Sequence, residues 1–217
     1  MEIKYFGHSS FLIKSKEAKL VTDPFDEKMV GLSFPKTEAD IVTVSHNHAD
    51  HNQIGKIIGD PLIINWPGQF EKKGIRVFGF RSFHDKQKGV ERGENNIYKI
   101  EVEGISIVHC GDLGIKPDDS ILDEIGDVGV LMVPVGGKFT LDASEAIELI
   151  KELEPSIVIP MHYNTPKLNQ INFSELAGVD EFLKKIGQES NQPVDKLVLK
   201  KEDLSDTMRV VIMNTSN

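Results

Sequence analysis

One short stretch of the chain concentrates the side chains best suited to metal chemistry. The apolar, β-branched run of residues 41–44 leads directly into a loop that carries His46, His48, Asp50 and His51. Neutral imidazoles together with a carboxylate suit a borderline-soft divalent ion, above all zinc. Since alternate residues of an extended chain share a side, His46, His48 and Asp50 are expected to project together and His51 in a second direction. Three of the seven histidines lie in this loop, so we predict a metal site rather than a chance polar loop.

Such a cluster needs ligands from elsewhere in the chain, and two histidines compete for one place. His84 and His109 each follow an apolar strand pattern. His109 lies only three residues before Asp112, which puts the two on opposite faces of a straight strand. This spacing favours His84 as the ligand and leaves His109 as a candidate for a supporting or catalytic role.

The spacing His-x-His-x-Asp-His resembles the signature of the metallo-β-lactamase superfamily, and other segments match that family in order. A strand pattern ends at Asp23-Pro24, Gly111 precedes Asp112, and Met161-His162-Tyr163 resembles the segment of the family's last metal-binding histidine. The segments Phe83-His84-Asp85 and Arg92-Gly93-Glu94-Asn95 resemble a smaller subgroup, the small β-lactamase-domain metal-dependent hydrolases related to the L-ascorbate-6-phosphate lactonases. The resemblance covers about residues 3–163.

The resemblance implies a site for two divalent ions, most simply zinc, with manganese or iron as alternatives. It places the first ion between His46, His48 and His84, and the second between Asp50, His51 and His162. Asp112 would bridge the ions through its two oxygens, and Asp23 would orient a metal-binding histidine. A hydroxide shared by the ions would attack an ester, lactone, thioester or phosphodiester of a small molecule, with Asp50 orienting it or accepting its proton.

Three other functions remain open at this point: a diiron redox enzyme, a nucleic-acid phosphodiesterase, and a metal-binding protein without catalysis. The redox members of the superfamily carry Glu where His48 stands, and no flavin module follows. No Gly-x-Ser-x-Gly motif indicates a serine nucleophile.

Further residues have two possible roles each. His8 lies in a Gly-His-Ser-Ser turn, where it is either a catalytic residue of the pocket or part of ordinary turn chemistry. Arg92 and Lys138 could bind an anionic group of the substrate or remain solvated. Cys110 is expected to be a small core residue.

Composition limits the class of protein. The 217 residues fit one domain, residues 1–217, and 39% hydrophobic and 27% charged residues are typical of a globular chain. The net charge of −9 disfavours nucleic acid and anionic membranes as partners. One cysteine excludes an internal disulfide framework, and neither a signal peptide nor a membrane span is visible. We therefore expect a cytoplasmic enzyme acting on a small molecule, with a homo-oligomer possible.

Periodicity predicts the elements that position these residues. Strands are expected at 3–6, 10–14, 19–22, 41–44, 62–65, 75–80, 97–102, 105–108, 128–133, 156–160, 196–199 and 208–213, and helices at 53–58, 117–125, after Asp142, and at 175–186. Residues 86–96 are expected to form a lid or a mobile surface loop. The pattern alone gives a mixed α and β protein; the resemblance implies an α+β fold, the αββα four-layer sandwich.

Overall fold

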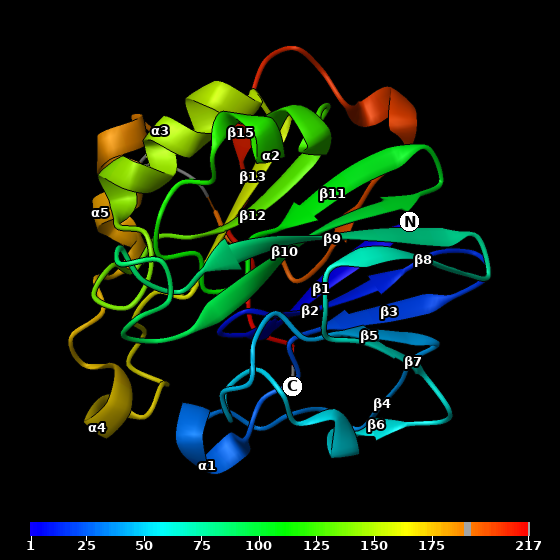
Figure 1. Ribbon diagram of the computed structural model, residues 1–217, viewed down its shortest axis with the longest axis horizontal. Helices are drawn as coiled ribbons and strands as arrows, with labels where there is room; N and C mark the ends of the chain where they lie inside the picture. Colours follow the sequence, from blue (N-terminus) through cyan, green and yellow to red (C-terminus); the bar gives the residue numbers. More distant parts are fainter. Residues whose placement is uncertain (189–191, 217) are drawn as a thin grey trace.

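Two stacked β-sheets form the centre of the structure, a computed structural model that describes residues 1–188 and 192–216 (Figure 1). The first sheet has the order β14 (Leu197–Val198), β1 (Glu2–Gly7), β2 (Ser10–Lys14), β3 (Lys19–Thr22), β5 (Ile41–Thr43), β7 (Leu62–Ile64). The second has the order β15 (Arg209–Val210), β13 (Ile157–Met161), β12 (Val130–Pro134), β11 (Ile105–His109), β10 (Glu94–Val102), β9 (Ile75–Phe83), β8 (Gly68–Lys72). A two-stranded ribbon pairs β4 (Thr37–Glu38) with β6 (Ile57–Ile58).

Helices cover the outer faces of both sheets, which confirms the expected αββα sandwich. In Figure 1, α2 (Asp119–Ile125), α3 (Ala143–Leu153) and α5 (Val179–Ile186) lie beyond the second sheet, while α1 (Glu27–Val30), α4 (Gln170–Phe173) and the β4–β6 ribbon lie on the opposite side of the molecule. The predicted start of α3 is confirmed, because Asp142 and Glu145 form a reciprocal capping box. None of the helices in the described residues has the length and apolar character needed to cross a membrane.

The strand residues alternate between two hydrophobic clusters. Leu20 and Ile41 belong to the large cluster, whereas their neighbours Val21 and Val42 belong to a smaller one that includes Phe25. This period of two is what a sheet buried on both faces requires. It explains why β3 and β5 carry consecutive apolar residues, Leu20-Val21 and Ile41-Val42.

Strand direction brings the ends of distant segments to one end of the sandwich. In the first sheet, β3 and β5 are parallel, and β1 runs in their direction because β2 is antiparallel to both β1 and β3. In the second sheet, β11, β12 and β13 are parallel, and β9 shares their direction through the antiparallel β10. The segments that follow β1, β5, β9, β11 and β13 therefore carry His8, the His46–His51 loop, His84, Asp112 and His162 together.

Several predicted elements were wrong in length or type. The helix predicted at 53–58 is a short 3-10 turn, Ile54–Lys56, followed by β6, because Ile57 pairs with Thr37 instead of continuing a helix. The helix predicted from residue 175 begins only after Gly178, its N-cap. The expected lid at 86–96 is shorter, since β10 already begins at Glu94.

Candidate metal centre

Seven side chains that the sequence predicted as metal ligands meet in overlapping groups at this end of the sandwich. Within each group, one ligand atom per residue lies within 4.8 Å of the others. The groups are His46, His48 and His84; then His8, Asp50, His51 and His162; then His46, His51 and Asp112. The third group shares His46 with the first group and His51 with the second, so the first two groups are adjacent.

The loop after β5 does not stay extended, and one prediction from alternation was wrong. The strand ends at Thr43, and the backbone N–H of His51 donates to the carbonyl oxygen of His48 at 2.9 Å, which closes a turn. Asp50 therefore joins the group of His51 rather than that of His46 and His48. The turn still presents two ligand sets in two directions.

A buried relay fixes which nitrogen of two histidines faces the site. Asp23 is fully buried, and its Oδ2 accepts from His51 Nδ1 at 2.8 Å and from the Ser45 hydroxyl at 2.6 Å. Ser45 Oγ then accepts from His46 Nδ1 at 3.0 Å, while the Ser45 N–H donates to Asp23 Oδ1 at 2.7 Å. Both imidazoles carry their proton on Nδ1 in this arrangement, which leaves the Nε2 lone pairs free. His46 Nε2 and His51 Nε2 are buried without a hydrogen-bond partner.

His84 is oriented in the same way by a different acceptor. Its Nδ1 donates to the carbonyl oxygen of Phe139 at 3.0 Å, and its Nε2 lies 3.3 Å from Asp112 Oδ2. The backbone that precedes β10 also holds it, since the His84 N–H donates to Gly93. Three histidines thus present Nε2 toward one space from three separate anchors.

Asp112 lies at the centre of the cluster. Its Oδ2 is 3.1 Å from His162 Nε2, 3.2 Å from His51 Nε2 and 3.9 Å from His46 Nε2, while Oδ1 is buried without a partner. The Asp112 N–H donates to Asn95 Oδ1 at 3.0 Å. Gly111 precedes it with φ +56°, and a Cβ there would overlap Asn95 and Ser45. Glycine is therefore required before Asp112, because the backbone at residue 111 lies too close to Asn95 and Ser45 for a side chain.

Charge and burial act against each other at these groups. Burial opposes ionisation of Asp112, but His162 and His51 outweigh it and hold the pKa of its carboxyl well below the usual range. Burial would lower the pKa of His51, but Asp112 and Asp50 raise it well above its ordinary value. For His46 burial dominates, and the pKa of its imidazole falls well below its ordinary value. Unpartnered Nε2 atoms and a low-pKa carboxylate fit a divalent cation, which would take the place of protons here.

His8 and His109 differ in their position relative to the cluster. His8 belongs to the second group; its Nε2 lies 3.1 Å from Asp50 Oδ2, and its side chain is fully buried. Burial, then the neighbouring His162, lowers the pKa of His8 to about 4, so its neutral form donates to Asp50. His109 is in none of the groups formed by the described residues: its Nε2 donates to the carbonyl oxygen of Ser9 at 2.8 Å, and its Nδ1 faces the Gly111 N–H at 3.3 Å. Of these two histidines, it is therefore His84 that lies with His46 and His48, and its role as a ligand stays a prediction.

Ser45 and Asn95 are the site residues that sequence reasoning missed. Each makes hydrogen bonds that hold the cluster, yet neither has a spacing signal of its own. Only their positions in the sequence could have indicated them. Ser45 directly precedes His46, and Asn95 lies in the segment that resembles the small hydrolase subgroup.

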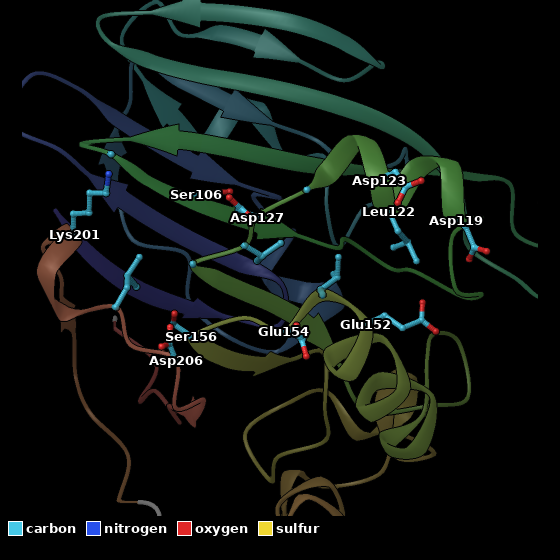
Figure 2. A pocket seen from close by; sticks show the side chains of 16 residues that line it. Ser106, Asp119, Leu122, Asp123, Asp127, Glu152, Glu154, Ser156, Lys201 and Asp206 are labelled. Atoms are coloured by element: carbon cyan, nitrogen blue, oxygen red, sulfur yellow. The ribbon is translucent and has the colours of Figure 1, made fainter.

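A large cavity lies elsewhere in the molecule. Its volume is about 840 Å³, and carboxylates such as Asp123, Asp127 and Glu154 line it, as Figure 2 shows. It adjoins the segments that lead into β12 and β13. Asp112 and His162 lie at the opposite end of the sheet, because they follow the C-terminal ends of β11 and β13 and these strands are parallel to β12. Cavity size therefore does not locate the candidate metal centre.

The fold and this cluster define a metal-dependent hydrolase built on an αββα sandwich. A family model described as "Beta-lactamase superfamily domain" matches residues 2–162, and the chain belongs to that superfamily. It is 28% identical to a metal-dependent hydrolase of Thermococcus kodakarensis in an alignment 192 positions long, gaps included, that covers 76% of this chain and 85% of the relative. It is 26% identical to one of Pyrococcus abyssi in an alignment 225 positions long, gaps included, that covers 90% of this chain and 96% of the relative.

Solved structures agree with this assignment. A candidate zinc-dependent hydrolase of the metallo-β-lactamase superfamily from Thermotoga maritima superposes with a TM-score of 0.80 at 35% identity, covering 98% of this chain and 97% of its own. A metallo hydrolase of Ignicoccus hospitalis has a TM-score of 0.66 at 21% identity, covering 92% and 99%, which shows the shared fold alone.

Proposed function

We propose that this protein holds two divalent ions, zinc first, and hydrolyses an ester, lactone, thioester or phosphodiester of a small molecule. The observation that carries the proposal is the pair of adjacent groups joined by Asp112. One group is purely histidine and the other contains Asp50, so each offers at least three ligand atoms. Ions bound there would supply Lewis acidity and make hydroxide available near neutral pH.

Asp50 is the residue proposed to handle the proton. Its Oδ2 accepts from His8, while Oδ1 is buried without a partner. The Asp50 side chain keeps 9% of its surface exposed against 3% for Asp112, so it is the more accessible of the two carboxylates. In this scheme Asp50 Oδ1 orients the attacking water and accepts its proton, and His8 Nε2–H fixes the carboxylate in place.

The remaining residues of the cluster position these groups. Asp23 and Ser45 keep the Nε2 atoms of His51 and His46 unprotonated, and the Phe139 carbonyl does the same for His84. Outer partners of this kind set ligand orientation and basicity. Burial of the cluster excludes bulk water, which strengthens each electrostatic contact.

The test combines metal analysis with a hydrolysis screen. Protein stripped with a chelator and reloaded with zinc, manganese or iron should cleave at least one of 4-nitrophenyl acetate, a δ-lactone, a thioester or bis(4-nitrophenyl) phosphate. Asp50→Asn should lose at least about a hundredfold in kcat. Asp26→Asn is the matched control, because Asp26 caps α1 and Asn caps equally well.

The possible failures lead to different conclusions. Hydrolysis that persists at full rate in Asp50→Asn removes the role of Asp50. Absence of hydrolysis with every metal and substrate class removes the proposed reaction. Oxygen consumption by the iron-loaded protein without hydrolysis would favour redox chemistry instead.

A further inference from the structure

The turn that follows His84 is held rigid by a single carboxylate. Asp85 is buried, and its two oxygens accept four backbone N–H groups, those of Gln87, Gly89, Glu91 and Arg92, at 2.8–3.1 Å. The His84 N–H donates to the carbonyl oxygen of Gly93 at 3.1 Å, which closes the base of the turn. The position of the Arg92 backbone is therefore fixed relative to His84.

The Arg92 side chain rests on an aromatic ring that is itself tied to the metal centre. The guanidinium carbon lies 4.2 Å from the centre of the Phe139 ring, within the range of a cation–π contact. The carbonyl oxygen of the same Phe139 accepts from His84 Nδ1. The backbone and the side chain of Arg92 are thus both held in a defined position relative to His84, one of the proposed metal ligands.

A cavity of about 230 Å³ borders His84, Arg92 and Phe139. Three cationic side chains line it, but two already have partners: Lys86 is paired with Glu145, and Lys138 with Glu175 at 2.8 Å. Across residues 1–188 and 192–216, no carboxylate forms an ion pair with the Arg92 guanidinium. The acidic side chains lining the cavity are Asp85, which the four N–H groups satisfy, and Glu91, which accepts from Gln87.

We propose that the Arg92 guanidinium, held on Phe139 beside His84, binds a carboxylate or phosphate group of the substrate. This rests on the proposed function, because it makes Arg92 the residue that selects anionic esters or lactones at that metal centre. The planar fork of a guanidinium matches two oxygens of a carboxylate or phosphate at once. The contact with Phe139 restrains the guanidinium before the substrate arrives, so less side-chain entropy is lost on binding.

The first experiment compares matched neutral and anionic substrates. The pairs are 4-nitrophenyl acetate with mono-4-nitrophenyl succinate, and glucono-δ-lactone with its 6-phosphate, so that the two pairs separate carboxylate from phosphate recognition. Arg92→Gln should reduce kcat/KM for an anionic member by about tenfold to a hundredfold through KM, and leave its neutral counterpart and the metal content unchanged. Lys138→Gln, which removes a paired cation from the same cavity, should keep the wild-type preference. An equal loss on neutral and anionic members, or no loss on either, overturns the proposal.

The second experiment does not depend on catalysis. Titration calorimetry of metal-free protein with glutarate and with inorganic phosphate should show binding of at least one anion, weakened about tenfold or more in Arg92→Gln. If no substrate is cleaved but this binding depends on Arg92, the hydrolase proposal fails and the anion site stands. If neutral substrates are cleaved and Arg92→Gln changes neither selectivity nor binding, the anion site fails and the hydrolase proposal stands.

Discussion

Replacing Asp23 with Asn should reverse the hydrogen-bond relay behind the metal centre while leaving its shape intact. The Ser45 N–H donates to Asp23 Oδ1, so the amide oxygen of Asn must take that position. The amide NH₂ then takes the place of Oδ2. In the wild type this oxygen accepts from both His51 Nδ1 and the Ser45 hydroxyl, whereas an NH₂ group can only donate. His51 must give up its Nδ1 proton, and Ser45 must accept from the new amide and donate to His46. Both histidines then carry the proton on Nε2, where a metal ion needs a lone pair.

The expected size of the effect follows from the number of histidines that change. One outer partner of a metal-binding histidine is worth about 10- to 100-fold in affinity, or about 1.4–2.8 kcal/mol. Asp23→Asn alters His46 in the first group and His51 in the second, so both ions should bind about 10- to 100-fold more weakly. Ser45→Ala removes the anchor of His46 and leaves that of His51, so only one ion should be affected.

The assay is zinc titration of metal-free protein against a competing chelator, with ¹⁵N chemical shifts of the imidazoles as an independent measure of the tautomer. Wild-type affinity for both ions in Asp23→Asn would refute the relay. So would an equal weakening of both ions in Ser45→Ala.

Other perturbations give equally specific outcomes. His84→Ala should lose one bound zinc per chain by elemental analysis, whereas His109→Gln should retain both, because His109 lies outside the clusters. Burial lowers the pKa of His109, so the unfolded chain takes up a proton there as pH falls below about 6.5 and stability decreases. His109→Gln has no proton to take up at this position, so its stability does not fall in this way. Urea unfolding should therefore show that the free energy of unfolding of wild type exceeds that of His109→Gln by less at pH 5 than at pH 7. Gly111→Ala should cost at least about 1–3 kcal/mol in the same assay, since it combines a left-handed φ with steric overlap. Burial raises the pKa of the Cys110 thiol, so iodoacetamide at pH 8 should label it, by mass spectrometry, only after denaturation.

The motif-bearing segments and many of the strands could be predicted because they depend on local patterns, whereas the fold class was implied by the resemblance. Buried strands such as β5 and β12 are continuous apolar runs, and helix α3 begins with a capping box. The resemblance supplied the order of the distant segments. The ligand roles themselves stay predictions, although the structure brings the seven residues together.

The missed elements have physical reasons. Helices α1 and α4 have four residues each, little more than one turn, and so show no helical periodicity. Strand β8 lies at the edge of its sheet and contains Gln, Glu and Lys, so it lacks an apolar run. The direction of Asp50 could not be predicted from alternation, because a backbone hydrogen bond within the loop turns the chain. Ser45 and Asn95 act through contacts between residues far apart in the chain, and one sequence does not show which partners they meet.

His46 follows a strand of the first sheet, and His84 follows a strand of the second. An ion coordinated by both would cross-link the two layers without a covalent bond. Pulling the layers apart would then require the ion to dissociate, so resistance to heat or force should grow with occupancy, by about 4 kcal/mol at free metal a thousandfold above Kd. The metal centre would then also hold the two sheets together, so loss of metal would lower the stability of the protein as well as its activity.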